Sequence, residues 1–232
     1  VAAVPAPYPY HLTPQKTPPA VFKRVESDKI IKTDKGRFFI DFGTELVGTT
    51  VFRVSGNRGH KVEIRHGEEL QAENVVRFDM RANCKYQEYC ILSGREEERL
   101  EFFDYKGFRY VEVLNWPEEL KREDVWVLNR YYPFPEENSF FSSSDHLLND
   151  IWQLCENGVK QGTQDTYLDC PTREKGGFLG DGYITGQTHL YLTGDLRLIK
   201  KFIKDFADSA RICPGILAVA PAYRPGEWAD YS

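Results

Sequence analysis

The sequence predicts a multidomain chain of the β plus α class, with an antiparallel β-sandwich at residues 21–135 and a helical region at residues 136–232. Short runs of β-branched and aromatic residues separated by turn signals continue as far as Tyr131. After Pro135 the apolar residues recur every three to four positions instead. Residues 1–20 contain six prolines, which predicts an extended linker rather than a folding unit.

The strands of the predicted sandwich follow from local patterns. Lys61–Arg65 alternates polar and apolar side chains, as a strand with one buried face does, and Gly56-Asn57-Arg58-Gly59 forms a turn before it. The runs with strand character are Phe38–Phe42, Val47–Val54, Lys61–Arg65, Tyr86–Leu92, Leu100–Phe103, Phe108–Leu114 and Val125–Tyr131. About seven short strands separated by turns are typical of an antiparallel sandwich.

Three helices are predicted after the sandwich. Ser144-Asp145 can cap the first, the second is expected to end near Gly194, and Asp195 can cap the third. The expected ranges are about 145–159, 181–191 and 195–210. The tail at 213–231 contains two Pro-Gly pairs and is predicted to be a loop.

The stretch Leu168–Asp181 interrupts the helical pattern and concentrates charged residues. It contains the carboxylates Asp169, Glu174 and Asp181 together with Arg173, and a proline and a Gly-Gly pair keep it out of regular structure. Catalytic residues are found disproportionately on loops that a rigid scaffold positions. The stretch therefore predicts a catalytic loop, and with it an enzyme.

Glu174 is the candidate proton donor of this loop. A glutamate that protonates a leaving group needs a pKa raised by burial or by a neighbouring carboxylate, which Asp169 or Asp181 could be. Two carboxyl groups in different environments are the usual equipment for glycoside hydrolysis. Two other interpretations stay open: the charges solvate a surface loop, and Asp181 only caps the second helix. In the tail, Trp228 and Asp230 could bind a sugar through the indole and the carboxylate, although a lone tryptophan is more often a core residue.

Composition restricts the partners and the compartment. A net charge of -5 and a pI near 5.6 argue against a nucleic-acid partner. No apolar run approaches the roughly 18 residues of a membrane-spanning helix, and no signal peptide is visible. The five cysteines lack metal-site spacing and indicate no disulfide framework. We therefore expect a cytoplasmic protein with reduced thiols and without nucleic-acid, membrane, metal or cofactor partners. Structural roles are expected for Cys170, His11, His60, His66, His146 and His189.

The loop resembles the catalytic motif of the bacterial α-L-rhamnosidases of glycoside hydrolase family 78. In that motif an Asp-Cys-Pro-x-Arg stretch leads to an acidic residue and then to an aromatic-x-Gly-Asp ending. The matching residues here are Asp169-Cys170-Pro171-Thr172-Arg173-Glu174 and Phe178-Leu179-Gly180-Asp181. The segments Ile40–Gly43, His66–Leu70 and Tyr105–Val113 are similar to the β-sandwich that precedes the barrel in this family, and the proline-rich start is similar to its linker.

This resemblance implies an (α/α)6 barrel of which residues 136–232 are the N-terminal part, an inverting mechanism without metal or cofactor, and Glu174 as the general acid. The residues that it assigns to the sugar pocket are Asp169, Arg173, Asp181, Trp228 and Asp230. The general base of the family is a glutamate from a later part of the barrel, outside these 232 residues. The resemblance therefore also implies that the catalytic domain is truncated and that this chain alone is inactive.

Two departures from the family motif leave the exact sugar open. The acidic residue that usually stands between the arginine and the catalytic glutamate is absent, and Phe178 stands where tryptophan is usual. Glu174 is matched to the acid because its spacing of seven to Asp181 is kept. A glycoside with a terminal rhamnosyl group is the expected substrate. The alternatives are an (α/α)6 glycosidase of different sugar specificity, a non-catalytic carbohydrate-binding module and a purely structural partner protein, and a homodimer is left open.

Overall fold

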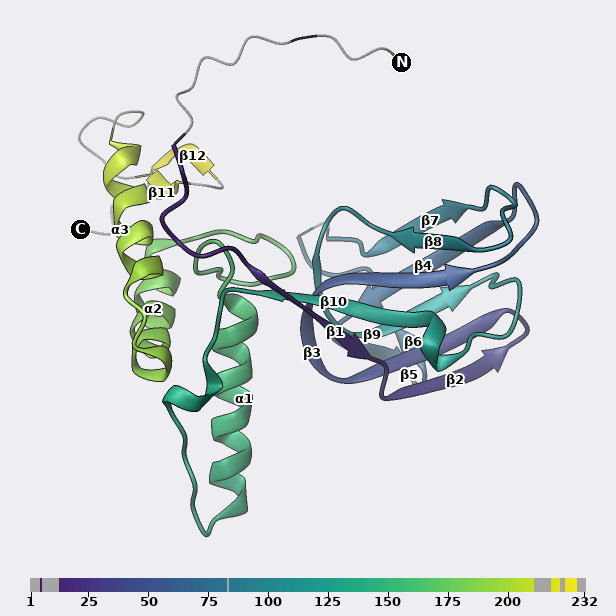
Figure 1. The fold of residues 1–232 in the computed structure, drawn as a ribbon, viewed down its shortest axis with the longest axis horizontal. Helices are drawn as coiled ribbons and strands as arrows, with labels where there is room; N and C mark the ends of the chain where they lie inside the picture. The colour runs from purple at the N-terminus through teal and green to yellow at the C-terminus, as the bar shows by residue number, and fades with distance from the viewer. Residues whose placement is uncertain (1–4, 6–12, 83, 211–217, 222–223, 229–232) are drawn as a thin grey trace.

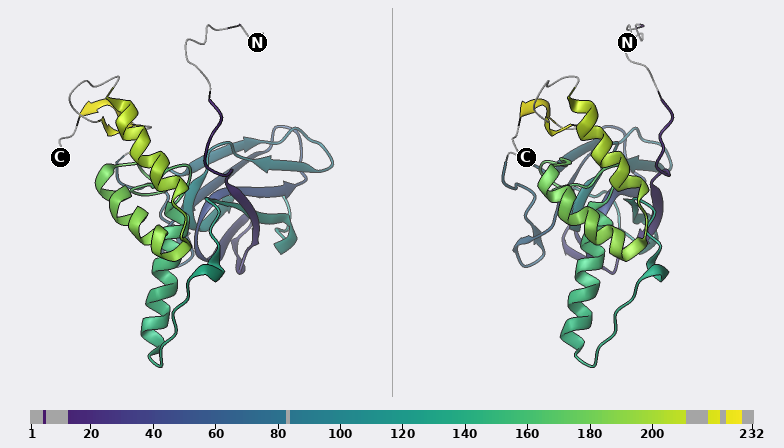
Figure 2. Two further views of the ribbon diagram at one scale, coloured as in Figure 1. Left: turned by 60° about the vertical axis from the view of Figure 1, so that its left-hand side comes forward. Right: turned by 90° about the vertical axis from the view of Figure 1, so that its left-hand side faces the viewer.

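The computed structural model describes residues 5, 13–82, 84–210, 218–221 and 224–228. It shows a β-rich body beside a helical body (Figures 1 and 2). The strands of the β-rich body are β1 Val21–Glu26, β2 Lys29–Asp34, β3 Arg37–Val54, β4 Lys61–Gly67, β5 Leu70–Ala72, β6 Val75–Val76, β7 Gln87–Ile91, β8 Glu98–Glu101, β9 Lys106–Leu114 and β10 Val125–Tyr131. These strands confirm the predicted β-region and add two strands near its start, β1 and β2, that were not among the predicted runs.

The central strand β3 corrects one prediction. Two strands were expected, yet β3 is a single strand of 18 residues with a bulge between Asp41 and Leu46 in its pairing with β9. Gly43 lies in the bulge at φ 78°, a conformation that glycine adopts easily, so the sequence resembles a turn there although the strand continues.

The long strand β3 lets one antiparallel sheet close around one core. The order of the sheet is β1-β10-β3-β9-β4-β7, and β2 and β8 also pair with β3. Phe38–Asp41 of β3 pairs with both β2 and β9, whereas Val51-Phe52 pairs with both β10 and β8. Side chains from both halves meet in one cluster, which includes Phe38, Ile40, Phe52, Ile64, Phe108, Val125 and Val127.

The three predicted helices are confirmed as α1 His146–Gly162, α2 Leu179–Thr193 and α3 Arg197–Ser209. The Asp145 carboxylate accepts the Leu147 amide at 3.0 Å and caps α1 as expected. Gly194 follows α2 in the left-handed conformation at φ 72°. Leu196 rather than Asp195 stands at the N-cap of α3, although Asp195 Oδ1 still accepts the Arg197 amide at 2.8 Å. None of the helices in the described residues is long and apolar enough to cross a membrane.

The tail differs from its prediction as a loop. Residues Ala218–Ala220 (β11) and Arg224–Trp228 (β12) form an antiparallel pair in which Ala218 lies opposite Trp228. Pro225 lies within β12. A two-stranded sheet tolerates this proline, because each of its strands has one edge that faces no partner strand. A missing backbone N–H on that edge breaks no hydrogen bond of the sheet.

The helices leave several apolar side chains uncovered. Gln161 is the one buried residue of α1, and Leu147 and Leu154 on the same helix are 64% and 73% exposed. Further exposed apolar residues on the helices are Leu148, Ile151, Tyr183, Ile184, Tyr191 and Ile203. Exposed apolar surface on this scale is typical of a face that another element packs against.

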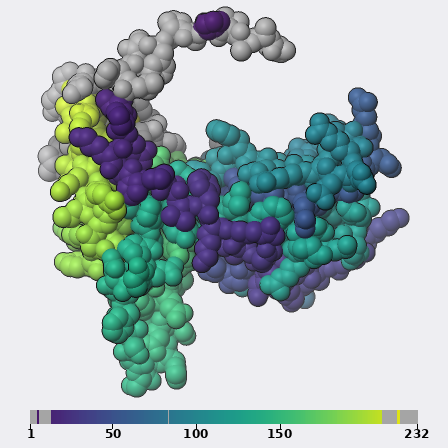
Figure 3. Space-filling view, viewed as in Figure 1, coloured from purple at the N-terminus to yellow at the C-terminus, as the bar shows by residue number. Residues whose placement is uncertain are grey.

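Buried polar contacts hold the end of α1 against the sheet. Gln161 Oε1 accepts the Val47 amide at 2.9 Å and the Asn129 side-chain amide at 2.8 Å. Asn129 also donates to the Val47 carbonyl at 2.8 Å. Because these groups are buried and paired, separating the helix from the sheet would leave several of them unsatisfied. The sandwich therefore fixes the position of the end of α1, and with it the start of the segment that follows this helix. On the face shown in Figure 3, residues 13–26 also pass from the helical body onto the β-rich body.

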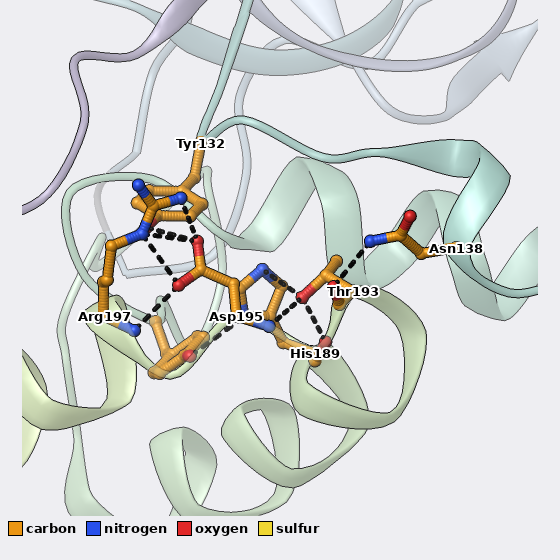
Figure 4. Close-up of polar contacts among 7 residues, drawn as sticks. Tyr132, Asn138, His189, Thr193, Asp195 and Arg197 are labelled. Atoms are coloured by element: carbon orange, nitrogen blue, oxygen red, sulfur yellow. Dashed lines mark hydrogen bonds and ion pairs between the residues drawn. The ribbon is translucent and has the colours of Figure 1, made fainter.

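A second buried network joins the end of β10 to α2 and α3 (Figure 4). The Tyr132 hydroxyl donates to Asp195 Oδ2 at 2.9 Å. The His189 ring has Tyr167 Oη at 3.1 Å from Nδ1 and Thr193 Oγ1 at 3.4 Å from Nε2. Tyr167 directly precedes the predicted catalytic loop, which begins at Leu168, so this network connects the helices to that loop.

Two buried histidines predict that the protein loses stability in mild acid. Burial lowers the pKa of His189 and, more strongly, that of His66 below about 6.5. The folded state therefore favours the neutral rings, while the unfolded chain takes up protons near pH 6.5. This stabilisation is complete above that pH and is lost as the pH falls toward the folded-state pKa values. We expect the free energy of unfolding to fall as the pH is lowered from 6 to 5. Each of the two histidines should contribute up to about 1.4 kcal/mol over this pH unit.

Urea unfolding between pH 5 and pH 7 measures this slope. The variant His189→Gln is expected to reduce it, and His146→Gln at the exposed start of α1 serves as the matched control. Equal slopes in the two variants would show that His189 does not contribute to the acid sensitivity.

Candidate active site

The predicted catalytic loop, Leu168–Asp181, lies in the connection 163–178 between α1 and α2 and continues into the first turn of α2. Thr163 and Tyr167 form an isolated β-bridge, and the Leu168 amide donates to the Gly162 carbonyl at 3.0 Å. Tyr167 is completely buried and packs edge-on against Phe202 of α3. The start of the loop is thus fixed on both sides by the helical body.

Asp169 closes the loop at its base. Its Oδ1 accepts the Gly176 amide at 2.8 Å, and its own amide donates to the Gly176 carbonyl at 2.9 Å. Residues 170–175 are therefore held as a closed loop that contains Glu174. A sugar-binding role was predicted for Asp169, and this structural role adds to it; the second carboxylate oxygen has no hydrogen-bond partner among the described residues.

Sandwich residues hold the loop from the other side. The Tyr86 hydroxyl donates to the Thr172 carbonyl at 3.0 Å. Lys175 Nζ donates to both oxygens of Asp104 at 2.8 and 2.9 Å and to the Tyr105 carbonyl at 2.6 Å. Sequence analysis missed Tyr86, Asp104 and Lys175 as supports of the site. The partners lie about 70 to 86 positions apart, and nothing in the local sequence pairs them.

Gly107 lets the sandwich approach the loop closely. A Cβ atom at this position would lie 2.9 Å from Pro171 Cγ and 2.9 Å from Thr172 Cγ2. These contacts are shorter than van der Waals distance, so a larger residue at position 107 forces Pro171, Thr172 or strand β9 itself to move.

We expect Gly107→Ala to shift the catalytic loop and to lower activity more than stability. A displacement of about 1 Å in a positioning element can cost up to about 100-fold in rate, whereas overpacking costs about 1–3 kcal/mol. Steady-state kinetics and urea unfolding of the same variant separate the two effects. Gly158→Ala is the matched control, because a Cβ at Gly158 meets nothing within 4 Å. Activity of Gly107→Ala equal to that of the control would contradict this role.

Glu174 occupies the closed loop with its carboxylate available. The side chain is half-buried, and within the described part of the chain no hydrogen bond or ion pair reaches it. It is thus a positioned carboxyl group that a substrate oxygen can approach, which is what a general acid requires.

Arg173 faces the sandwich across a cavity of about 290 Å³. The cavity is lined by Glu68, Glu69, Arg77, Met80, Arg81 and Arg173. Desolvation raises the pKa of Glu68, and the Arg173 charge opposes that shift. The charges of this cavity therefore come from both domains.

Glu45 in the β3 bulge is a further carboxyl group that sequence analysis missed. Burial, with a smaller contribution from the nearby Glu68 charge, raises its pKa to about 8, and its Oε1 atom is buried without a hydrogen-bond partner. The Glu45 carbonyl accepts the Asn157 side-chain amide from α1 at 3.2 Å. Glu45 therefore retains its proton near neutral pH at the junction of the two domains.

The remaining predicted residues lie beyond the loop. Asp181 is exposed in the first turn of α2, while Phe178 is the N-cap, so the interpretation of Asp181 as the capping residue is wrong. Its charge still lies near the positive end of the helix dipole. Trp228 is the last residue of β12, and Asp230 lies outside the described residues. The structure places Asp169, Arg173 and Glu174 in one loop. The catalytic role of Glu174 and all the sugar-pocket assignments stay predictions.

Family models match both structural parts of the chain. The bacterial α-L-rhamnosidase concanavalin-like domain matches residues 31–130, and the bacterial α-L-rhamnosidase 6 hairpin glycosidase domain matches residues 136–232. The chain belongs to the bacterial α-L-rhamnosidase family. The first match covers most of the sandwich, and the second contains the catalytic loop.

Curated α-L-rhamnosidases are similar over most of this chain. The enzyme of Streptomyces avermitilis is 28% identical over 209 residues, which are 88% of this chain and 20% of that protein. One from Formosa agariphila is 28% identical over 204 residues, which are 85% of this chain and 22% of that protein. The chain thus spans about a fifth of the length of these curated relatives.

Solved α-L-rhamnosidase structures have the same fold. The S. avermitilis enzyme in complex with L-rhamnose superimposes with a TM-score of 0.79 at 27% identity, covering 89% of this chain and 20% of that chain. The enzyme from Dictyoglumus thermophilum also gives a TM-score of 0.79, at 24% identity over 93% of this chain and 24% of that chain. The sandwich followed by the start of the helical domain is therefore the α-L-rhamnosidase arrangement.

Proposed function

We propose that the protein containing this chain hydrolyses terminal α-L-rhamnosyl linkages with Glu174 as the general acid. The observation that carries the proposal is the placement of Glu174. It lies in a loop that the Asp169–Gly176 hydrogen bonds close and that the sandwich braces, within the segment matched by the glycosidase domain of the family. A rhamnose complex of a relative supports the choice of sugar.

In the proposed reaction Glu174 donates its proton to the glycosidic oxygen as the bond to the anomeric carbon breaks. Arg173, Asp169 and Asp181 bind and orient the sugar hydroxyls, with Trp228 and Asp230 completing the pocket. A water molecule attacks from the opposite face, so the product forms with inversion. An inverting site needs a second carboxylate at roughly 6.5–9.5 Å from the acid to activate that water.

We assign this second carboxylate to a part of the helical domain beyond these 232 residues, and we propose that the 232 residues alone are inactive. The chain spans about a fifth of the curated relatives, and the exposed apolar side chains of α1 offer a surface for further helices.

Proton NMR of the reaction of an aryl α-L-rhamnoside tests the proposal. The substrate is incubated with an enzyme of full family length that contains this chain and, separately, with the 232 residues alone. We expect the longer enzyme to release rhamnose first as the β-anomer, and the 232 residues to release none. Release of the α-anomer first would contradict inversion. Cleavage of another glycoside but not of the rhamnoside would contradict the substrate.

A further inference from the structure

A second cavity, of about 720 Å³, lies on the sandwich away from the Arg173 cavity. Its floor is the side of β1, β10 and β3 that faces away from the core, where Phe22 lies opposite Arg130 and Leu128 lies opposite Thr49. Its wall is formed by Glu101 at the end of β8 and by residues 102–105, which connect β8 to β9. The neighbouring strands β1 and β10 are visible side by side in Figure 1.

The opening of this cavity carries exposed aromatic rings beside charged groups. Phe103 in the wall is fully exposed at 106%, and Phe22 in the floor is 63% exposed. Glu101 and Asp104 add carboxylates to the same lining. A pyranose ring offers an apolar C–H face that packs on such rings, and hydroxyl groups that carboxylates and guanidinium groups bind. The lining is therefore complementary to a saccharide.

The wall of the cavity is bonded to the catalytic loop. The Tyr105 ring has the Arg130 guanidinium 4.9 Å from its centroid and the Lys175 ammonium 4.2 Å from it. Lys175 also binds both carboxylate oxygens of Asp104. Since Lys175 directly follows Glu174, a ligand in this cavity would lie beside the loop that carries the proton donor.

We propose that this cavity binds a saccharide unit of the leaving group, the part of the glycan that remains after the rhamnosyl residue is removed. The proposal rests on the proposed function. A neutral saccharide fits better than an anion, because Glu101 and Asp104 repel negative charge and Arg130 already donates to Gln164 at 2.8 Å. The sandwich would then take part in substrate selection as well as supporting the loop.

A binding measurement that needs no catalysis tests the cavity directly. The 232-residue chain is titrated with α-L-rhamnosyl-(1→6)-D-glucose by calorimetry, beside its variants Phe103→Ala and Phe140→Ala. Phe140 is also exposed, at 88%, but lies outside the cavity lining. We expect Phe103→Ala to weaken binding about tenfold and Phe140→Ala to leave it unchanged. No binding to the unmodified chain, or equal binding by all three proteins, would overturn the proposal.

Kinetics in an enzyme of full family length then test the link to the reaction. The ratio of kcat/KM on a rhamnosyl-glucoside to kcat/KM on a small aryl rhamnoside is expected to fall about tenfold in Phe103→Ala and to stay unchanged in Phe140→Ala. An unchanged ratio in Phe103→Ala would overturn the leaving-group assignment. If no rhamnoside is cleaved while the disaccharide still binds through Phe103, the proposed function fails and the saccharide site remains.

Discussion

Replacing Glu174 with glutamine in an enzyme of full family length is expected to lower kcat on rhamnosides with poor leaving groups by about 10²–10⁴-fold. Glutamine keeps the size and shape of the side chain but has no proton to transfer to the departing oxygen, and general acid catalysis contributes a factor of this order. Since the Glu174 side chain has no hydrogen-bond partner among the described residues, the change should leave the fold intact. Steady-state kinetics on a series of aryl α-L-rhamnosides measure the loss.

The dependence on the leaving group distinguishes an acid from a merely structural residue. A leaving group of low pKa departs without protonation, so Glu174→Gln should lose much less activity on dinitrophenyl than on unsubstituted phenyl rhamnoside. Glu73→Gln, at an exposed position on the sandwich, is the matched control and should retain activity on both. An equal loss on both substrates, or near-parental activity on the poor one, would assign the acid to another residue. Glu45, whose pKa is raised to about 8, would be the next candidate.

The replacement Gly48→Ala is expected to destabilise the sandwich by about 3 kcal/mol or more. Gly48 lies where β3 leaves β9 and pairs with β10. A Cβ atom there would lie 2.1 Å from the Leu128 carbonyl oxygen and 2.9 Å from its carbon. These are backbone atoms of a paired strand, so no side-chain rotation can relieve the overlap and the two strands must separate. Urea unfolding of the variant beside the unmodified chain measures the loss.

The variant Gly158→Ala is expected to change the free energy of unfolding in the opposite direction in the same urea experiment. Gly158 lies on the exposed side of α1, and a Cβ atom there meets nothing within 4 Å. Alanine in a helix is favoured over glycine by roughly 0.5–1 kcal/mol, so this variant should be slightly more stable. Equal stability of the Gly48 and Gly158 variants would show that the β3–β10 approach is not tight.

The predictions for Glu174→Gln and Gly48→Ala concern the same feature of the protein, which is the sandwich as the support of the predicted catalytic loop. Val47, next to Gly48, is bonded through its amide to Gln161 at the end of α1. Lys175, next to Glu174, is bonded to Asp104 between β8 and β9. Damage to the sheet should therefore disturb both ends of the predicted catalytic loop, because the sandwich supports the loop at both of them.

Local patterns in the sequence were sufficient for most of the elements. Strands such as Lys61–Gly67 can be predicted from the alternation of polar and apolar residues, because one face of the strand is more buried than the other. Helices such as α1 are visible from apolar spacing and from the Asp145 cap, both of which act within one or two turns. The candidate catalytic loop was predicted on the same basis, since its carboxylates, arginine and glycines lie within one short stretch of the chain.

Local patterns failed where a distant segment decided the conformation. Residues 42–45 resemble a turn, but pairing with β9 on both sides keeps β3 continuous through a bulge. The tail containing Pro225 resembles a loop, but pairing between β11 and β12 makes it a hairpin. In both cases the hydrogen bonds come from a partner strand that the local sequence does not specify.

The sequence by itself therefore determined the two structural classes, the three helices, the position of the predicted catalytic loop and the family to which the chain belongs. Only the tertiary structure decided how the loop that carries Glu174 is held. Asp169 closes the loop, and Tyr86 and Asp104 of the sandwich form hydrogen bonds to it. Gly107 leaves the space that the loop occupies. The physical reason is the separation along the chain over which each kind of interaction acts. Propensity, capping and periodicity act over a few residues, whereas these supports join atoms about 70 to 86 positions apart, and their geometry exists only once both domains have packed.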